Sequence, residues 1–211
     1  GYTIGGLLGN GSSFVMRDAH GIRPAYYYIN DEVIVAASER AAIRTTFNVG
    51  ENEVMELMPG TAIIVDEKGN YAIEKILEPK ERRACSFERI YFSRGSDFEI
   101  YQERKNLGRL LVPTILDAVK HDVENTVFSY IPNTAEVAFI GMTEEIQKQH
   151  IQRKLSAFSK GDIKTTDELH RQLSIMPRVA KIAIKDVKMR TFVTDDSSRN
   201  DLVQHVYDVT Y

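Results

Sequence analysis

Cysteine is almost missing from this sequence, which has one, Cys85, in 211 residues. A single cysteine excludes a disulfide framework, and it also excludes a metal site built only from cysteines of this chain. The five histidines stand far apart, and none lies at metal-binding spacing from a second ligand. We therefore expect the histidines to be surface groups or to have hydrogen-bond partners within the fold.

Long apolar runs and a strong charge of either sign are missing too. No stretch approaches the length of a membrane span, and the formal net charge is only −3, with an isoelectric point near 6.0. This balance disfavours a protein that binds nucleic acid over its whole surface. With 43% hydrophobic residues, the composition is typical of a globular protein. We expect a cytoplasmic, enzyme-like chain that binds neither membranes nor nucleic acid.

The first part of the sequence predicts antiparallel strands. Apolar segments come in pairs around short loops rich in glycine, asparagine and aspartate, and Asn10-Gly11 favours the positive φ angles of a tight hairpin. Between the second and third pairs, Ser38 is a candidate N-cap for a short helix. The expected strand pairs are Tyr2–Leu8 with Ser13–Met16, Ala25–Ile29 with Glu32–Ala37, and Thr61–Val65 with Tyr71–Leu77.

The pattern changes after residues 78–83, a charged segment with a proline that we interpret as a linker. Beyond it, strand and helix patterns alternate, which favours a parallel sheet. The expected elements are a strand at Glu88–Ser93, a helix capped by Ser96 with apolar residues from Ile100 to Val119, a strand at Thr126–Ile131, a helix from Ala135 to Phe158, a helix capped by Thr165, and a strand at Val179–Val187. The sequence therefore predicts an α+β part followed by an α/β part.

Two segments have the chemistry of an anion site. Tyr130–Glu136 is a strand end that turns into a helix, and such a turn offers backbone N–H groups and a favourable dipole to phosphate. Thr134 would add a hydroxyl to phosphate or to bound Mg²⁺, and the alternative is a helix cap with nothing bound. Arg178–Arg190 is rich in basic side chains, which suit a multiply phosphorylated ligand. Lysines that protect a solvated strand edge from aggregation would give the same pattern.

Several segments resemble, in the same order, the motifs of one enzyme family. Arg17–Pro24, RDAHGIRP, is similar to the RDPxGIRP segment in the glutaminase domain of the amidophosphoribosyltransferases. The other matching segments are Ala36–Glu39, similar to VASE; Met58–Gly60, similar to a PGE-type turn; Cys85–Arg94, similar to CxFEYVYFAR; Ile131–Thr134, at the place of the pyrophosphate loop; and Arg190–Val193, similar to the RTFI flexible loop.

The resemblance implies a fold and an activity. Residues 1–83 would form the second half of an N-terminal-nucleophile glutaminase domain with antiparallel sheets. Residues 84–211 would form the first part of a phosphoribosyltransferase domain with a parallel sheet. The family's glycosyltransferases hydrolyse glutamine and pass the ammonia to phosphoribosylpyrophosphate (PRPP), giving phosphoribosylamine for purine synthesis. The expected partners are glutamine, PRPP and regulatory purine nucleotides, and a homo-oligomer is expected.

Site residues are implied only where the sequence matches the family's motifs. The pyrophosphate loop would contain Pro132, Asn133, Thr134, Ala135 and Glu136, with the Thr134 hydroxyl on Mg²⁺. A loop that closes over PRPP would carry Lys185, Arg190 and Thr191. Tyr91 would line the ammonia channel, and Cys85 matches a cysteine that ligates a [4Fe–4S] cluster in some members of the family.

The sequence also departs from the family. It begins at Gly1, with neither Met nor the N-terminal cysteine nucleophile of the glutaminase. The ribose-phosphate motif is missing as well, Gly95 stands in place of the proline of RPDS, and Asn133 stands where an acid is common. We therefore expect an interior segment of a longer polypeptide, without catalytic residues of its own and inactive by itself.

Two alternatives stay open. One is a homologue that has lost catalysis and serves as a nucleotide-binding or regulatory protein. The other is a different class II amidotransferase that delivers ammonia to another acceptor. Arg190-Thr191-Phe192 disfavours the second alternative, because those enzymes lack an RTF loop after a strand.

Overall fold

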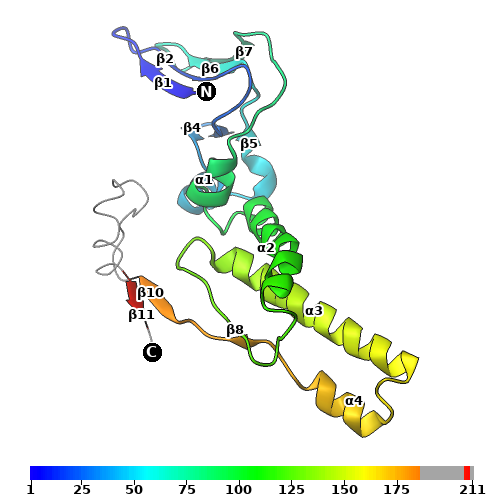
Figure 1. Ribbon diagram of the computed structural model, residues 1–211. Coiled ribbons are helices and arrows are strands. Elements are labelled where there is room, and N and C mark those ends of the chain that lie inside the picture. The colour runs from blue at the N-terminus through cyan, green and yellow to red at the C-terminus, as the bar shows by residue number, and fades with distance from the viewer. Residues whose placement is uncertain (186–206, 210–211) are drawn as a thin grey trace, which may run out of the picture. The chain divides into compact units, whose positions relative to one another are not determined.

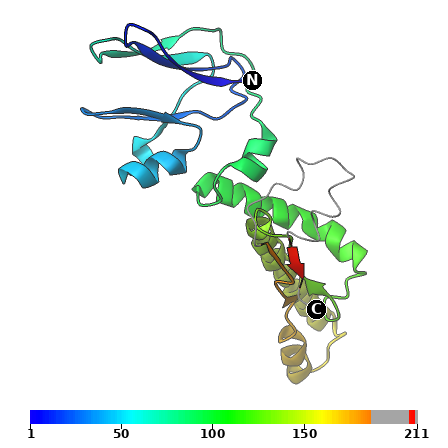
Figure 2. The same cartoon turned by 90° about the vertical axis from the view of Figure 1, so that its left-hand side faces the viewer.

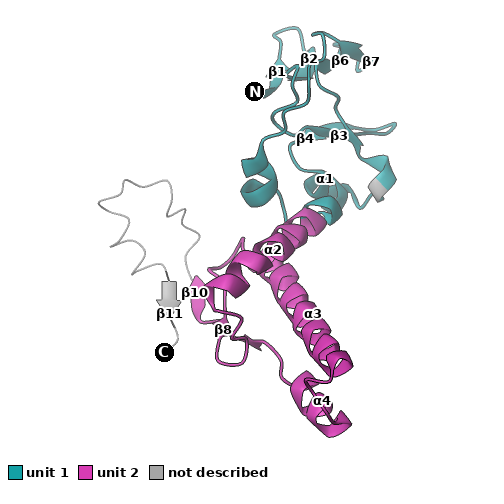
Figure 3. Ribbon diagram, turned by 45° about the vertical axis from the view of Figure 1, so that its right-hand side comes forward, with its two compact units in different colours: residues 1–100 teal, residues 101–211 magenta. Residues whose placement is uncertain are grey.

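The computed structural model describes residues 1–185 and 207–209 (Figure 1). The chain divides into two compact units, Gly1–Ile100 and Tyr101–Tyr211, coloured separately in Figure 3. The first unit contains antiparallel strands and short helices, and the second contains the long helices. Residues 84–100 therefore belong to the first compact unit, whereas the domain boundary after residue 83 stays a prediction.

Two antiparallel sheets form the first unit (Figure 2). The buried side chains of Ala25, Leu57 and Ile63 lie between them, and half-buried apolar residues of both sheets pack around these three. Helix α1 (Arg40–Phe47) lies beside the smaller sheet. One sheet has the order β1-β2-β6-β7, with β1 (Thr3–Leu7), β2 (Ser13–Arg17), β6 (Thr61–Val65) and β7 (Tyr71–Lys75); the other has the order β4-β3-β5, with β3 (Tyr26–Ile29), β4 (Ile34–Ala37) and β5 (Met55–Glu56).

The three predicted hairpins, β1–β2, β3–β4 and β6–β7, are confirmed. Each turn is closed by one side chain that accepts a hydrogen bond from a backbone N–H two residues further along the chain. The acceptors are Asn10, Asn30 and Asp66, and the distances from their Oδ1 atoms to the N–H nitrogens are 3.1, 2.9 and 2.9 Å. Short side chains of this kind stabilise turns because they satisfy a backbone donor locally.

The expectation that Ser38 caps α1 is wrong. The N-cap is Glu39, and its side chain makes no capping hydrogen bond to the helix. The Glu39 carboxylate instead accepts a hydrogen bond from the backbone N–H of Arg94, at 3.1 Å. A long-range contact has therefore taken the place of the local cap.

Residues 78–83, interpreted above as a linker, are hydrogen-bonded to the first unit. The backbone N–H groups of Lys80 and Arg83 donate to the carbonyls of Ala19 and His20, both at 2.9 Å. The side chains in this segment are exposed, as a charged composition predicts, but the backbone is held in place. The segment behaves as an irregular edge of the unit.

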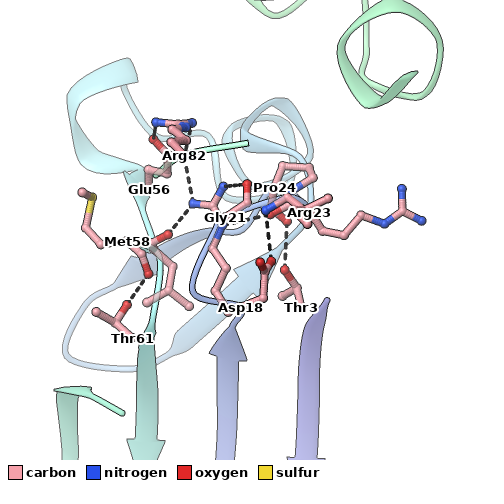
Figure 4. A network of polar contacts seen from close by, with 12 residues as sticks. Thr3, Asp18, Gly21, Arg23, Pro24, Glu56, Met58, Thr61 and Arg82 are labelled. Atoms are coloured by element: carbon pink, nitrogen blue, oxygen red, sulfur yellow. Dashed lines mark hydrogen bonds and ion pairs between the residues drawn. The ribbon is translucent and has the colours of Figure 1, made fainter. Parts of the chain in front are cut away.

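The buried Arg17 side chain holds β2 to the segments around it, and its partners Gly21, Arg23 and Glu56 are labelled in Figure 4. Its guanidinium is 1% exposed and forms an ion pair with Glu56 at 2.8 Å. It also donates to the backbone carbonyls of Gly21, Arg23 and Leu57, at 3.1, 2.9 and 2.5 Å. A buried guanidinium with this many acceptors fixes the positions of three chain segments at once.

Asp18 closes the loop that follows Arg17 (Figure 4). Its carboxylate accepts hydrogen bonds from the backbone N–H groups of His20 and Ile22, both at 3.0 Å, and from that of Tyr2 at 3.3 Å. Gly21 has φ = +59° in this loop, and a Cβ atom there would press on the ring of Pro59. The RDAHGIRP motif is therefore a structural loop in this chain.

The second unit is built around two long helices, α2 (Phe98–Ala118), whose first turn lies in the first unit, and α3 (Glu136–Lys160). Its core contains the buried residues Val112, Leu116, Val123, Phe128, Met142 and Ile146. The remaining elements are β8 (Val127–Phe128), α4 (Thr166–Leu173), β9 (Arg178–Val179), β10 (Ala183–Lys185) and β11 (Tyr207–Val209). Among the described residues no helix is both long and apolar enough to cross a bilayer.

Helices α2 and α3 approach each other most closely at two glycines. A Cβ atom on Gly108 would overlap the backbone carbonyl of Ala138, and one on Gly141 would overlap the carbonyl of Lys105. The two backbones are thus in direct contact, which only glycine permits. Glu144 strengthens the contact, since its carboxylate pairs with Lys105 at 2.6 Å and with Arg109 at 3.3 Å.

The elements of the second unit match the predictions in part. Thr165 caps α4 as expected, since its hydroxyl accepts a hydrogen bond from the N–H of Glu168 at 3.1 Å. β8 and β9 are parallel, whereas β10 pairs with β11 in the antiparallel sense. The strand expected at Val179–Val187 is divided into β9 and β10, and its last two residues lie outside the described part of the chain.

Candidate functional site

The loop between β8 and α3 is the candidate site. Residues 132–135 form the turn, and α3 begins directly after them. The N-cap residue, Ala135, has no side chain that could cap the helix, and only the first and fourth N–H groups, those of Glu136 and Phe139, have backbone partners. The N–H groups of Val137 and Ala138 have no partner among the described residues. Such unpaired N–H groups at a helix N-terminus are typical of an anion site.

Thr134 gives this loop a hydroxyl with no partner among the described residues. Pro132 beneath it is buried, Thr134 is half-buried, and Asn133 and Ala135 are exposed. A hydroxyl supplies one oxygen ligand, whereas Mg²⁺ takes six and usually keeps waters and substrate phosphates among them. The described residues hold no group of three or more His, Cys, Asp or Glu that could bind a metal. A Mg²⁺ ion bound at Thr134 would therefore need most of its ligands from water or from a bound molecule.

A tyrosine fixes the acidic side chain at the start of α3. The Tyr130 hydroxyl donates to Oε1 of Glu136 at 3.0 Å, and its ring packs on Phe139 with 4.9 Å between centroids. Partial burial and this hydrogen bond both raise the pKa of Tyr130, so the donor stays protonated at neutral pH. Because the Glu136 carboxylate is negative, the helix terminus favours an anion that is accompanied by a cation.

Lys185 is the last residue of β10, and it pairs across the sheet with Tyr207. The segment that leads into β10 runs beside the end of β8, because the N–H of Ile182 donates to Oγ of Ser129 at 3.3 Å. The start of β10 and the beginning of the candidate loop therefore lie at the same end of β8. Arg190 and Thr191, the other residues expected to close over PRPP, lie outside the described residues.

Tyr91 lies in a π-helix, Glu88–Phe92, where the sequence predicted a strand. That prediction is wrong because the aromatic side chains pack against one another at helical spacing. The ring centroids of Phe87 and Tyr91 are 5.5 Å apart, and Phe92 lies 5.2 Å from Phe87 and 5.4 Å from Tyr91. The segment is an aromatic cluster of the first unit, and the role of Tyr91 in a channel stays a prediction.

Cys85 is a free, half-buried thiol whose backbone N–H donates to the carbonyl of Ile22 at 3.0 Å. It lines a cavity of about 30 Å³ together with charged residues of the first unit, including Arg17 and Glu56. Such a volume holds a water molecule and is too small for an iron–sulfur cluster. With one cysteine in the chain, the residues present do not fit a [4Fe–4S] cluster by themselves.

Asp97, rather than the predicted Ser96, caps α2. Its Oδ1 accepts hydrogen bonds from the N–H groups of Glu99 and Ile100, at 3.1 and 3.3 Å. The same carboxylate forms a two-bond ion pair with Arg40, at 3.0 and 3.1 Å, which joins α1 to the start of α2. Burial opposes ionisation, but these hydrogen bonds outweigh it and hold the pKa of Asp97 below its ordinary value.

We expect Asp97→Asn to remove an acid-sensitive part of the stability. The pKa of Asp97 is lower in the folded chain than in the unfolded chain, where it is about 4. The ionised carboxylate therefore contributes fully to the free energy of unfolding above about pH 4. This contribution is lost as the pH falls through the lower, folded-state pKa. The substitution should cost about 1–3 kcal/mol at neutral pH. Urea unfolding at several acidic pH values should then show a shallower acid dependence in the variant. Asp31→Asn, at an exposed carboxylate without a partner among the described residues, should keep the wild-type dependence.

His150 is a residue whose role the sequence did not indicate. Histidines were expected to be surface groups or to have hydrogen-bond partners within the fold. The Nε2 atom of His150 is buried and has no hydrogen-bond partner among the described residues. Its neighbours come from distant positions, so no spacing in the sequence could have identified it. The expectation is therefore met only in part, because the ring is hydrogen-bonded with the backbone of Gln172 while Nε2 has no partner among the described residues.

The chain was compared with known proteins. No family model matches it. The amidophosphoribosyltransferase of Methanothermobacter thermautotrophicus is 28% identical over 145 residues, which are 66% of this chain and 28% of that protein. Chloroplastic amidophosphoribosyltransferase 1 of Arabidopsis thaliana is 31% identical over 132 residues, 60% of this chain and 21% of that protein. The Escherichia coli amidophosphoribosyltransferase is 25% identical over 185 residues, 72% of this chain and 36% of that protein.

The chain therefore spans between about a fifth and about a third of the length of these relatives. Among solved structures, the glutamine PRPP amidotransferase of B. subtilis complexed with ADP and GMP is similar, with a TM-score of 0.56 and 24% identity. The match covers 94% of this chain and 36% of the B. subtilis chain. A structure described as the allosteric regulatory enzyme of purine biosynthesis matches 90% of this chain, with a TM-score of 0.56 and 23% identity. These two likenesses establish the fold. The chain is similar to amidophosphoribosyltransferases over most of its length.

Proposed function

We propose that this chain is part of a glutamine-dependent amidophosphoribosyltransferase and that residues 132–136 bind the pyrophosphate group of PRPP. The observation that carries the proposal is the N-terminus of α3, which has no side-chain cap and follows the turn at residues 132–135, in a chain similar to this family across most of its length. The first part would be the second half of a glutaminase domain, residues 1–83. The remainder, residues 84–211, would begin a phosphoribosyltransferase domain with a parallel sheet.

Within this proposal, the loop binds PRPP mainly through its backbone. The unpaired N–H groups of Val137 and Ala138 donate to pyrophosphate oxygens, and the helix dipole favours the negative charge. Bound Mg²⁺ would neutralise part of the diphosphate charge, with the Thr134 hydroxyl as one of its ligands. Lys185, Arg190 and Thr191 would close over the ligand, exclude water and stabilise the departing pyrophosphate.

Thr134→Val is expected to weaken the binding of magnesium–PRPP about tenfold, because it removes one oxygen ligand and leaves the backbone donors in place. Isothermal titration calorimetry of the 211-residue chain with PRPP and Mg²⁺ measures this directly. Thr166→Val is the matched control, since Thr166 is an exposed threonine in the first turn of another helix, α4. Equal affinities for wild type and both variants would contradict the assignment of the loop.

The activity is tested on the full gene product. Arg190→Ala should abolish the synthesis of phosphoribosylamine from glutamine and leave glutamine hydrolysis intact. Tyr91→Ala should uncouple the two reactions, so that ammonia is released into solution. Asn133 stands where the family commonly has an acid, and this difference favours the alternative, a nucleotide-binding or regulatory homologue. That alternative predicts binding of PRPP or nucleotides with neither reaction catalysed.

A further inference from the structure

A second pocket lies in the second unit, between the end of α2 and the middle of α3. Its volume is about 300 Å³, at the lower end of the range for small-molecule sites. Its floor is apolar and is made by Leu116, Val123, Ile146 and Ala157. The lining residues 121–124 precede β8, whereas the candidate pyrophosphate loop follows that strand. The pocket is therefore at the opposite end of β8 from the proposed PRPP site.

His150 is one of the residues that line this pocket. Nε2 is buried and has no hydrogen-bond partner within residues 1–185, while the ring is held by a hydrogen bond with the backbone of Gln172 in α4. Burial and the nearby positive charge of Lys154 lower the pKa of His150. The ring is therefore neutral at physiological pH. With the proton on the nitrogen bonded to the Gln172 carbonyl, Nε2 presents a lone pair.

Charges of both signs surround this nitrogen. Glu124 and Arg153 both line the pocket and both act electrostatically on His150, and neither forms an ion pair among the described residues. Lys154 adds a second positive charge and is oriented by Gln172, to whose side-chain oxygen it donates at 2.6 Å. His121 and Asp122 complete the rim, but their side chains already contact Asp117 and Asn125. The charged groups of the pocket without an ion pair among the described residues are thus one acid, Glu124, and one arginine, Arg153.

We infer that this pocket binds a small zwitterion of the size of an α-amino acid. Its carboxylate would pair with Arg153 and Lys154, and its ammonium group would donate to the carboxylate of Glu124. A simple anion would leave the charge of Glu124 unpaired in the site, and a simple cation would face Arg153 and Lys154. A zwitterion pairs with the charges of both signs together.

Titration of the 211-residue chain, labelled with ¹⁵N at histidine, tests this inference by NMR. The probes are the standard α-amino acids, with acetate and methylammonium as half-ligands. At least one amino acid should shift the His150 imidazole signals saturably, with a Kd of about 1 mM or below. Its N-acetyl and carboxamide derivatives should bind at least about tenfold more weakly, because each lacks one of the two charges.

Two variants locate the binding groups. Glu124→Gln and Arg153→Gln should each raise the Kd about tenfold, whereas Lys148→Gln, an exposed cation of α3 outside the pocket, should leave it unchanged. Thr134→Val should leave the Kd of the amino acid unchanged. Failure of amino-acid binding can therefore be distinguished from failure of PRPP binding at the loop. The inference is overturned if no amino acid up to about 20 mM shifts His150, if a half-ligand binds equally well, or if the variants bind like the wild type.

Discussion

Arg17→Met is expected to destabilise the first unit by about 3–5 kcal/mol. Methionine keeps the apolar stem but removes the guanidinium, and the carbonyls of Gly21, Arg23 and Leu57 then lose a donor that water cannot easily replace, because the side chain is 1% exposed. The carboxylate of Glu56 loses its buried partner in the same step. Urea unfolding followed by circular dichroism measures the change in the free energy of unfolding.

Arg82→Met is the matched control for this prediction. Arg82 also pairs with Glu56, at 2.6 Å, but its side chain is 49% exposed and donates to no other residue in the described structure. An exposed ion pair contributes about 0–1 kcal/mol, so the control should stay close to the wild type. If the two substitutions cost the same, the buried network around Arg17 does not stabilise the unit.

Gly141→Ala is expected to destabilise the second unit by about 2–4 kcal/mol. Alanine in place of a glycine inside a helix ordinarily stabilises it by about 1 kcal/mol, so the local effect has the opposite sign. The clash decides the outcome, because the added methyl group would overlap the carbonyl of Lys105, a backbone atom that cannot rotate away. Separation of the helices would also open the core around the buried residues Val112 and Met142. Thermal and urea unfolding of the variant measure the loss.

The two glycines also allow a test by a double-mutant cycle. Gly108→Ala should cost a similar amount, because its methyl group would overlap the carbonyl of Ala138. The double variant should cost less than the sum, since one methyl group already separates the helices. Ser156→Ala, at an exposed position of α3, should change the stability by no more than about 0.5 kcal/mol. A stabilised Gly141→Ala variant would show that α2 and α3 do not pack closely.

The parts of the fold that were predicted correctly depend on local chemistry. The hairpins follow from Asn10, Asn30 and Asp66, each of which satisfies a backbone N–H two residues away. The cap of α4 by Thr165 is local in the same sense, since donor and acceptor are three residues apart. Such features need no knowledge of the rest of the chain, so the sequence is sufficient to predict them.

The parts that were predicted wrongly depend on distant residues. Ser38 and Ser96 are good caps in isolation, but Glu39 binds Arg94 and Asp97 binds Arg40, and these long-range contacts set the helix starts. The aromatic segment Glu88–Phe92 has the composition of a strand, and its π-helical form follows from packing among the rings. A short apolar segment of this kind does not determine its own secondary structure.

The anion site at the transition from strand to helix before Glu136 stays a prediction. The structure adds that the N-terminus of α3 has no side-chain cap. Which backbone N–H groups in the first turn of α3 stay unpaired could not be predicted, because the geometry of the turn decides which of them donate to a carbonyl. The pocket at His150 gave no signal in the sequence, since Glu124, Arg153 and Gln172 belong to three separate segments that meet only in the folded chain.

The hydrogen bonds of residues 80–85 to residues 19–22 have a consequence for exchanging parts between relatives. A chimaera joined after residue 83 would place Cys85 of one parent against Ile22 of the other, and would separate Arg40 from its matched Asp97. A junction after Ile100 keeps every one of these pairs in a single parent. Natural recombination or laboratory shuffling that respects the fold should therefore carry residues 84–100 with the segment before them.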